Sequence, residues 1–232
     1  MAWAMYLAGM DVKDVHMTDL ISGRETLDDV NMIVFVGGFS NSDVLGSAKG
    51  WAGAFLFNPK ARMALEKFYA RPDTLSLGVC NGCQVMMELG LVYPGRNEHP
   101  KMHLNKSGKF ESSFLTLNIE PNESVMLKSL AGSRLGIWVA HAEGQFVLPD
   151  PIDSYHSPAR FSYSGYPANP NGSPADIASL CSEDGRHLVM MPHLERAFLP
   201  WQWPHYPADR VQDEATPWLE AFVNARNWIK TC

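Results

Sequence analysis

The sequence predicts an α/β domain in which helices cover a mostly parallel sheet. Residues 32–36 form a continuous apolar run, which is typical of a strand buried on both faces of a parallel sheet. Residues 74–79 are a second strand of this kind, and residues 48–70 between them have a helical pattern. Strands that alternate with helices in this way indicate a layered α/β architecture.

The remaining elements of the first half follow from local signals. Residues 1–8 are good helix formers, and Gly9 can end that helix. Residues 12–17 are predicted as a short strand. Asn58 and Pro59 interrupt the long helical stretch. Residues 81–89 form a helix directly after the second buried strand.

The second half contains fewer regular signals. Residues 114–119 alternate apolar and polar side chains, which predicts a half-exposed strand. Further strands are expected at residues 135–140 and 187–191, and loops at residues 149–174. The last helix is predicted to start after Thr216 as N-cap, with a proline at its first position.

The composition limits which classes of protein this sequence can belong to. A chain of 232 residues with 46% hydrophobic residues fits one domain, which we assign to residues 1–232. The 25 acidic residues outnumber the 19 basic ones, and no basic run is present, which argues against nucleic acid as a partner. The longest apolar run is too short to cross a bilayer, so no membrane association is expected. The chain start lacks the pattern of a secretory signal. Four cysteines in a chain of this length favour a reducing, cytoplasmic setting.

The segment Leu-Gly-Val-Cys-Asn-Gly-Cys-Gln at residues 77–84 is the most informative one. A strand ends there, Cys80 occupies the sharp turn, and a helix begins, which is the pattern of a nucleophile elbow. Gly78 and Gly82 relieve crowding around the turn. The helix N-terminus places backbone N–H groups beside the sulfur and favours the thiolate.

Cys80 and Cys83 also form a CxxC pair, which leaves a second interpretation open. This spacing permits thiol–disulfide exchange. A zinc site is less favoured, because no second CxxC or paired histidine run completes four ligands, and we expect no metal. We expect Cys83 to be an inert buried thiol that faces back along the helix.

A thiolate nucleophile needs a base and a group that orients the base. His193 follows a predicted strand and Pro192, and Glu195 lies close enough to hold the far nitrogen of its imidazole. Gly37 and Gly38 end another strand, where backbone N–H groups can face a developing oxyanion.

These segments resemble the class I glutamine amidotransferase family, and within it the glutaminase domain of the phosphoribosylformylglycinamidine synthase family. The resemblance covers nearly the whole chain and rests on motifs that come in the family's order. These motifs are Gly-Gly-Phe-Ser at 37–40, Asp-Val-Leu-Gly at 43–46, Gly-Val-Cys-Asn-Gly-Cys-Gln at 78–84, Asn-Lys-Ser-Gly-Lys-Phe-Glu at 105–111, His-Ala-Glu-Gly-Gln-Phe at 141–146, Tyr-Pro-Ala-Asn-Pro-Asn-Gly-Ser at 166–173 and Met-Pro-His-Leu-Glu-Arg at 191–196.

The resemblance implies a three-layer, flavodoxin-like fold and a glutaminase activity. Glutamine would be hydrolysed through a thioester on the nucleophile, and its ammonia would convert formylglycinamide ribonucleotide to the amidine in purine biosynthesis. The synthetase domain of the same enzyme is the implied partner. The resemblance implies no cofactor in this domain, with ATP and Mg expected only in the synthetase portion.

The resemblance also assigns roles to individual residues. Cys80 matches the nucleophile, His193 the general base and acid, and Glu195 its orienting partner. The implied oxyanion hole and substrate contacts are the backbone amides of Gly38, Phe39 and Asn81 and the side chains of Gln84, Asn105, Ser107, Phe110 and His141.

One departure from the family concerns the start of the chain. Family members place a strand before the helix that opens this sequence, so we expect an N-terminally truncated fragment of a longer enzyme. A stand-alone glutaminase subunit is the alternative parent. Loss of an inner strand is expected to expose apolar surface or to leave backbone groups without partners.

Overall fold

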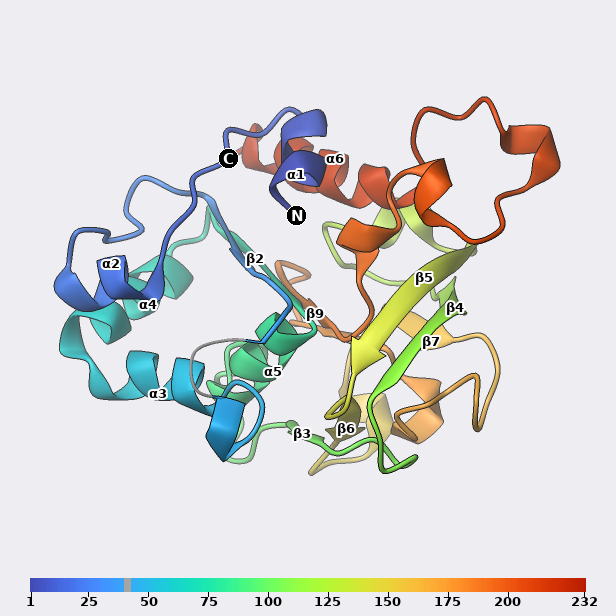
Figure 1. Ribbon diagram of the computed structural model, residues 1–232. Coiled ribbons are helices and arrows are strands. Elements are labelled where there is room, and N and C mark those ends of the chain that lie inside the picture. Colours follow the sequence, from blue (N-terminus) through green and yellow to red (C-terminus); the bar gives the residue numbers. More distant parts are fainter. Residues whose placement is uncertain (40–42) are drawn as a thin grey trace.

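A four-stranded sheet forms the centre of the protein (Figure 1), and the elbow cysteine directly follows one of its two inner strands. The structure is a computed structural model that describes residues 1–39 and 43–232. The strands lie in the order β1 (Met32–Phe35), β2 (Leu75–Val79), β9 (His187–Met190) and β8 (Ser179–Cys181). The first three are parallel and β8 is antiparallel to β9, so the central sheet is mostly parallel, as predicted.

Every residue of β2 and β9 is buried, which accounts for their apolar sequences. Between β1 and β2 lie helices α3 (Lys49–Phe57) and α4 (Pro59–Ala70). Asn58 separates the two helices, because its side chain caps α4 by accepting hydrogen bonds from the amides of Lys60 and Ala61 at 3.1 and 3.0 Å. The predicted break is therefore confirmed.

The helices lie in separate groups around this sheet. Helix α1 (Ala2–Leu7) packs beside α6 (Trp218–Ile229), the predicted last helix, whereas α2 (Met17–Ser22) packs against α4 (Figure 1). Helix α5 (Asn81–Glu88) follows β2 directly and contacts β1 and β2. Short 3-10 turns lie at Asp43–Leu45, Lys128–Leu130, Ile152–Ser154, Pro174–Asp176, Leu194–Arg196, Pro200–Gln202 and Ala208–Arg210.

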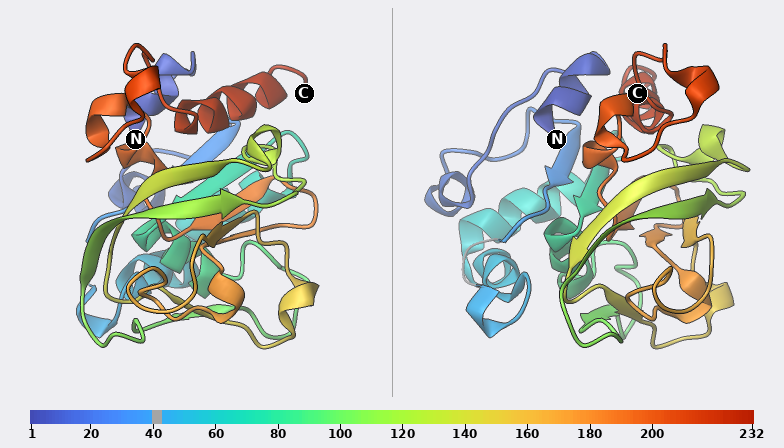
Figure 2. Two further views of the ribbon diagram at one scale, coloured as in Figure 1. Left: turned by 90° about the vertical axis from the view of Figure 1, so that its right-hand side faces the viewer. Right: turned by 45° about the vertical axis from the view of Figure 1, so that its right-hand side comes forward.

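An antiparallel layer packs beside the central sheet (Figure 2). Its strands are β4 (Glu111–Ile119), β5 (Arg134–His141) and β7 (Ala159–Phe161), with β4 in the middle. β7 lies within the stretch that we predicted as loops. A separate pair joins β3 (Lys101–His103) to β6 (Gln145–Val147).

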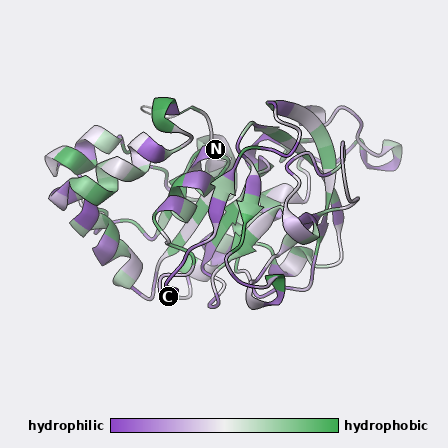
Figure 3. Cartoon of the chain, turned by 90° about the horizontal axis from the view of Figure 1, so that it is seen from below, coloured by the Kyte–Doolittle hydropathy of each residue, from purple (hydrophilic) through white to green (hydrophobic). Residues whose placement is uncertain are grey.

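One hydrophobic core joins these parts. Figure 3 shows hydrophobic residues concentrated in the central strands, while the outer helices alternate hydrophobic and hydrophilic residues. Trp218 and Phe222 of α6 are fully buried, and the Trp218 indole donates a hydrogen bond to the Gly136 carbonyl of β5 at 2.7 Å. Among the described residues, none of the helices has the length and apolar character needed to span a membrane.

The predicted strand at residues 12–17 is wrong. Residues 11–16 are not part of any strand, and α2 begins at Met17. A strand needs a hydrogen-bonded neighbour, and within the described residues this segment has none. It instead borders a groove of about 460 Å³ that runs between β1 and α6.

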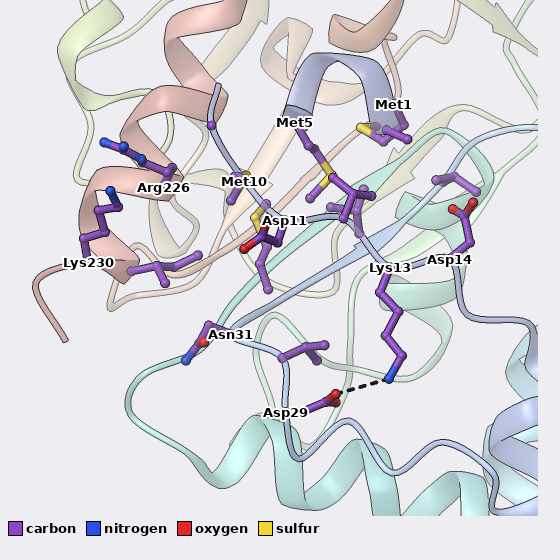
Figure 4. Close-up of a pocket in the computed structure, with 18 residues that line it drawn as sticks. Met1, Met5, Met10, Asp11, Lys13, Asp14, Asp29, Asn31, Arg226 and Lys230 are labelled. Carbon is purple, nitrogen blue, oxygen red and sulfur yellow. Dashed lines mark hydrogen bonds and ion pairs between the residues drawn. The ribbon is translucent and has the colours of Figure 1, made fainter. Parts of the chain in front are cut away.

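The groove also explains why β1 is only partly buried. β1 pairs with β2 on one side, and across the described residues its other edge has no strand partner. Apolar side chains line the groove, and Lys13 reaches over it to Asp29 at 3.2 Å (Figure 4). Apolar side chains therefore lie beside an edge of β1 that has no strand partner within residues 1–39 and 43–232. The apolar lining comprises Met1, Met5, Met10, Val12, Val30, Met32, Val34, Val36 and Ile229.

Candidate active site

Cys80 lies between β2 and α5, as the elbow pattern predicts. Its backbone is in an unusual conformation, with φ 53° and ψ −109°, and its amide donates to the Met190 carbonyl of β9 at 2.9 Å. The thiol donates to the Ala140 carbonyl of β5 at 3.5 Å. The turn thus directs the sulfur away from the central sheet and toward the antiparallel layer.

Two glycines allow α5 to lie this close to the sheet. A Cβ atom on Gly82 would lie 1.8 Å from the Phe35 carbonyl oxygen, and one on Gly78 would lie 2.6 Å from the Gly82 carbonyl oxygen. Both close contacts are with backbone atoms, which cannot rotate away. The residues that flank the elbow are therefore small for steric reasons, as predicted.

His193 follows β9 and reaches the same place from a distant part of the chain. Its amide donates to the Trp138 carbonyl of β5 at 2.8 Å, which fixes the loop. A Cβ atom on Gly37 would lie 2.8 Å from His193 Cε1 and 3.1 Å from Cys80 Cβ. Cys80 and His193 therefore lie together beside the Gly37 backbone.

Glu195 orients the imidazole. His193 Nδ1 donates to Glu195 Oε1 at 2.7 Å, and both side chains are largely buried. Nε2 has no hydrogen-bond partner among the described residues. The nitrogen opposite the carboxylate is therefore available to the sulfur and to a bound substrate.

The charge state of His193 follows from these neighbours. Burial lowers the pKa of His193, but its interactions with Cys80 and Glu195 outweigh burial and raise the pKa to about 9. The imidazolium form is consequently favoured at neutral pH beside the sulfur. Because this pKa exceeds the ordinary value of 6.5, the interaction stabilises the fold fully below pH 6.5 and is lost as the pH rises through 9.

Titration of His193 provides a direct test. We expect its imidazole, followed by nitrogen-detected NMR, to titrate with a midpoint near pH 9. Glu195→Gln should lower that midpoint by about one to three units, because it removes a neighbouring negative charge. His187, whose pKa burial lowers to about 4, is the comparison and should not respond to Glu195→Gln. A His193 midpoint below 6.5 would contradict the arrangement described here.

A pocket of about 550 Å³ opens above these residues. It is lined by the three predicted catalytic residues, and also by the predicted oxyanion-hole residues Gly38, Phe39 and Asn81. Asn81 is the first residue of α5, so its backbone N–H has no acceptor within the helix. The residues predicted to supply these donors therefore line the same pocket as Cys80.

The predicted substrate contacts divide into two groups. Gln84, Phe110 and His141 line the pocket, whereas Asn105 and Ser107 do not. Asn105 is buried behind the pocket wall, where its side chain donates to the His141 carbonyl at 2.8 Å and accepts from the Gly144 amide at 2.9 Å. The Ser107 hydroxyl is buried without a partner among the described residues. The direct contact with substrate that we predicted for these two residues is thus not supported by the geometry.

Gln84 lines the pocket, and each end of its side-chain amide makes one hydrogen bond within the protein. Its Nε2 donates to the Glu143 carbonyl at 2.7 Å, and its Oε1 accepts from Asn81 at 3.2 Å. His141 is buried, and burial together with the nearby His193 lowers its pKa to about 4. It is therefore neutral at physiological pH.

Sequence reasoning missed three charged residues that line the pocket, Asp43, Glu143 and Arg196. All three occur in the quoted motifs, and Glu143 and Arg196 come shortly after the predicted strands at residues 135–140 and 187–191. Charged residues at strand ends would have been the signal. No cluster of three or more His, Cys, Asp or Glu side chains suited to a metal occurs in the described ranges.

Residues 1–229 match the model of the CobB/CobQ-like glutamine amidotransferase domain family. The chain belongs to this family. The resemblance found in the sequence is thereby confirmed. The matched residues include all those that line the pocket.

Named relatives of this amidotransferase domain are longer proteins. It is 46% identical over 253 residues to a probable phosphoribosylformylglycinamidine synthase, chloroplastic/mitochondrial, of Arabidopsis thaliana, covering 100% of this chain and 18% of the relative. It is 44% identical over 254 residues to phosphoribosylformylglycinamidine synthase of Homo sapiens, and this match covers 98% of this chain and 19% of the relative. The chain thus spans about a fifth of the length of these curated relatives.

Solved structures support the fold of the amidotransferase domain. PurLQS from Thermotoga maritima matches with a TM-score of 0.66 and 26% identity, over 89% of this chain and 82% of that one. The glutaminase domain of Trypanosoma brucei CTPS with bound acivicin matches with a TM-score of 0.57, over 99% of this chain and 86% of that one. Because the two are only 17% identical, this match supports the fold alone. The flavodoxin-like α/β prediction agrees with both.

Proposed function

We propose that this chain hydrolyses the side-chain amide of glutamine and supplies the ammonia to a synthetase portion of the same enzyme. The convergence of Cys80, His193 and Glu195 on one pocket carries the proposal. The names of the curated relatives support the wider reaction, in which formylglycinamide ribonucleotide becomes the amidine during purine biosynthesis. ATP and Mg²⁺ would act in the synthetase portion, and this domain would need no cofactor.

The first half of the reaction transfers the glutamyl group to sulfur. The Cys80 thiolate attacks the amide carbon, and the carbonyl oxygen gains negative charge beside the backbone amides near Gly38 and Asn81. Loss of one such donor typically costs about 10²–10³ in rate. The C–N bond then breaks as His193 gives its proton to the nitrogen, which leaves ammonia and a γ-glutamyl thioester.

The second half releases glutamate. Neutral His193 takes a proton from water, which attacks the thioester carbon, and the Cys80 sulfur leaves as a thiolate. Glu195 holds Nδ1 throughout and stabilises the imidazolium that forms. The cycle therefore restores the starting charges of the pair.

A glutamine-like diazoketone tests the proposal. We expect 6-diazo-5-oxo-L-norleucine to add to Cys80, and site-resolved mass spectrometry should find the adduct there and not on Cys83 or Cys181. Excess glutamine should protect Cys80. Absence of labelling in the full-length protein, or labelling that glutamine does not reduce, would overturn the assignment.

The main alternatives are another thiol amidohydrolase of this fold and a CxxC thiol-redox protein. Cys83 is fully buried, and burial together with the neighbouring Cys80 raises the pKa of its thiol well above the usual range. A thiol of this kind is a poor partner for disulfide exchange. Burial thus favours amide hydrolysis over redox chemistry.

Cys83→Ala separates these two interpretations. The change removes one buried sulfur and leaves the catalytic residues in place, so we expect glutaminase turnover within about threefold of the parent, because a small core truncation mainly affects stability. Release of glutamate by the full-length enzyme is the measurement. Loss of all turnover in a folded variant would favour redox exchange.

The proposal also concerns the activity of the isolated chain and its location in the cell. The isolated chain should hydrolyse glutamine weakly, because the partner that consumes ammonia is elsewhere in the enzyme. Strong glutamine turnover by the isolated chain would contradict this expectation. We also propose a cytoplasmic location, which imaging of a fluorescent fusion of the full-length protein would test.

A further inference from the structure

The active-site pocket contains a carboxylate that has no cationic partner. Glu143 lies in the turn between β5 and β6, is half-buried, and lines the pocket. Its two carboxylate oxygens accept only from the Ser47 amide, each at 3.3 Å. No lysine, arginine or histidine side chain of the described residues forms an ion pair with it. A half-buried carboxylate in this situation favours a cation.

Hydrogen bonds fix the backbone of the turn that carries Glu143. The Glu143 carbonyl accepts from Gln84, and the Asn105 side chain accepts from the Gly144 amide at 2.9 Å. The Asn105 amide donates to the Ala142 carbonyl at 2.7 Å. The neighbouring His141 is buried and neutral, so it does not balance the charge of Glu143. The position is therefore organised before any ligand binds.

A cation without an anionic partner lines the same pocket. Arg196 ends the short turn Leu194–Arg196 that follows His193, and its side chain is exposed. No aspartate or glutamate of the described residues forms an ion pair with its guanidinium. Within the described part of the chain, the pocket that contains the nucleophile is thus also lined by a carboxylate and a guanidinium that form no ion pair.

We propose that Glu143 binds the α-ammonium group of the substrate and Arg196 its α-carboxylate. This inference rests on the proposed function and names the part of glutamine that the catalytic residues do not touch. Glutamine is a zwitterion at neutral pH, and its head group would satisfy both charges of the pocket at once. The site would thus select an amide that belongs to an α-amino acid.

Two alkylating reagents test the inference on Cys80. 6-Diazo-5-oxo-L-norleucine has an α-amino acid head group, whereas iodoacetamide has none. We expect Glu143→Gln and Arg196→Gln to slow labelling of Cys80 by the diazoketone roughly 10- to 100-fold, the usual range for one hydrogen bond to a charged group. Labelling by iodoacetamide should change less than threefold. Peptide-resolved mass spectrometry is needed because Cys232 is exposed and would react as well.

Glu214→Gln is the matched control, because this glutamate is exposed and lies outside the pocket. Equal slowing of both reagents in Glu143→Gln would indicate a damaged site and overturn the inference, as would unchanged labelling by both. If the diazoketone fails to label the parent protein, the proposed function fails first. Failure of the inference and failure of the function are therefore distinguishable.

A substrate that lacks the α-amino group sharpens the test in the full-length enzyme. The 4-carbamoylbutanoate ion keeps the amide and the carboxylate of glutamine but has no ammonium group. Glu143→Gln should raise KM for glutamine about 10- to 100-fold with kcat changed much less, and should leave kcat/KM for 4-carbamoylbutanoate nearly unchanged. An equal loss with both substrates would mean that Glu143 does not bind the ammonium group.

Discussion

Replacement of Cys80 with serine should abolish the covalent intermediate and lower glutaminase turnover by roughly three orders of magnitude or more. Serine occupies nearly the same space, but its hydroxyl is almost entirely protonated at neutral pH. The His193 imidazolium, which suits a thiolate partner, is a poor base toward a hydroxyl. The measurements are glutamate release by the full-length enzyme and the mass of the acyl-enzyme after rapid quenching with glutamine.

Cys232→Ser provides the control for this experiment, since Cys232 is exposed at the end of the chain and far in sequence from the elbow. It should retain parental turnover. The circular dichroism spectrum and melting temperature of Cys80→Ser should match those of the parent, which would restrict the effect to chemistry. Parent-like hydrolysis by Cys80→Ser would remove the nucleophile assignment and the mechanism built on it.

Gly82→Ala should destabilise the protein by about 3 kcal/mol or more, a value at the upper end for overpacked sites. The added Cβ would lie 1.8 Å from the Phe35 carbonyl oxygen and 2.4 Å from its carbonyl carbon. Since both are backbone atoms, α5 must move away from β1. Such a movement displaces Cys80, so labelling of Cys80 by the diazoketone should also be lost.

Gly53→Ala is a suitable control because Gly53 also lies in a helix, α3, where a Cβ would approach nothing closer than 3.8 Å. Alanine is the better helix former by about 0.5–1 kcal/mol, so this variant should be as stable as the parent or slightly more stable. Urea unfolding of both variants gives the comparison. Equal stability of Gly82→Ala and the parent would mean that α5 does not pack on β1 as described.

The parts of the fold that depend on local signals were predictable from the sequence. β2 and β9 are apolar because they are buried, β1 is apolar although only partly buried, and the Asn58–Pro59 break follows from helix capping by Asn58. Residues 12–16 have strand-like composition too, yet a strand forms only beside a partner, and composition does not report what lies beside a segment. The antiparallel pairing of β4 with β5 and β7 depends on the same non-local information.

The site shows the same division between local and long-range information. The elbow and the spacing of His193 and Glu195 are local patterns, and the structure brings them together in one pocket. The role of Asn105 was not predictable, because its hydrogen bonds reach residues 36 and 39 positions away. That Glu143 and Arg196 form no ion pair within the described residues could not be predicted either, because it depends on which oppositely charged side chains lie near them in the fold.

The backbone conformation of Cys80 has a consequence for the protein as a whole. A φ of 53° with ψ of −109° disfavours any residue that has a Cβ, and such strain costs of order 1–3 kcal/mol. Glycine at this position would relieve the strain and give a more stable folded protein that lacks the nucleophile. The surrounding strands, and the hydrogen bond that the Cys80 amide donates to the Met190 carbonyl, therefore maintain the reactive geometry against the conformational preference of the backbone. Selection for thermal robustness alone would remove the residue on which catalysis depends.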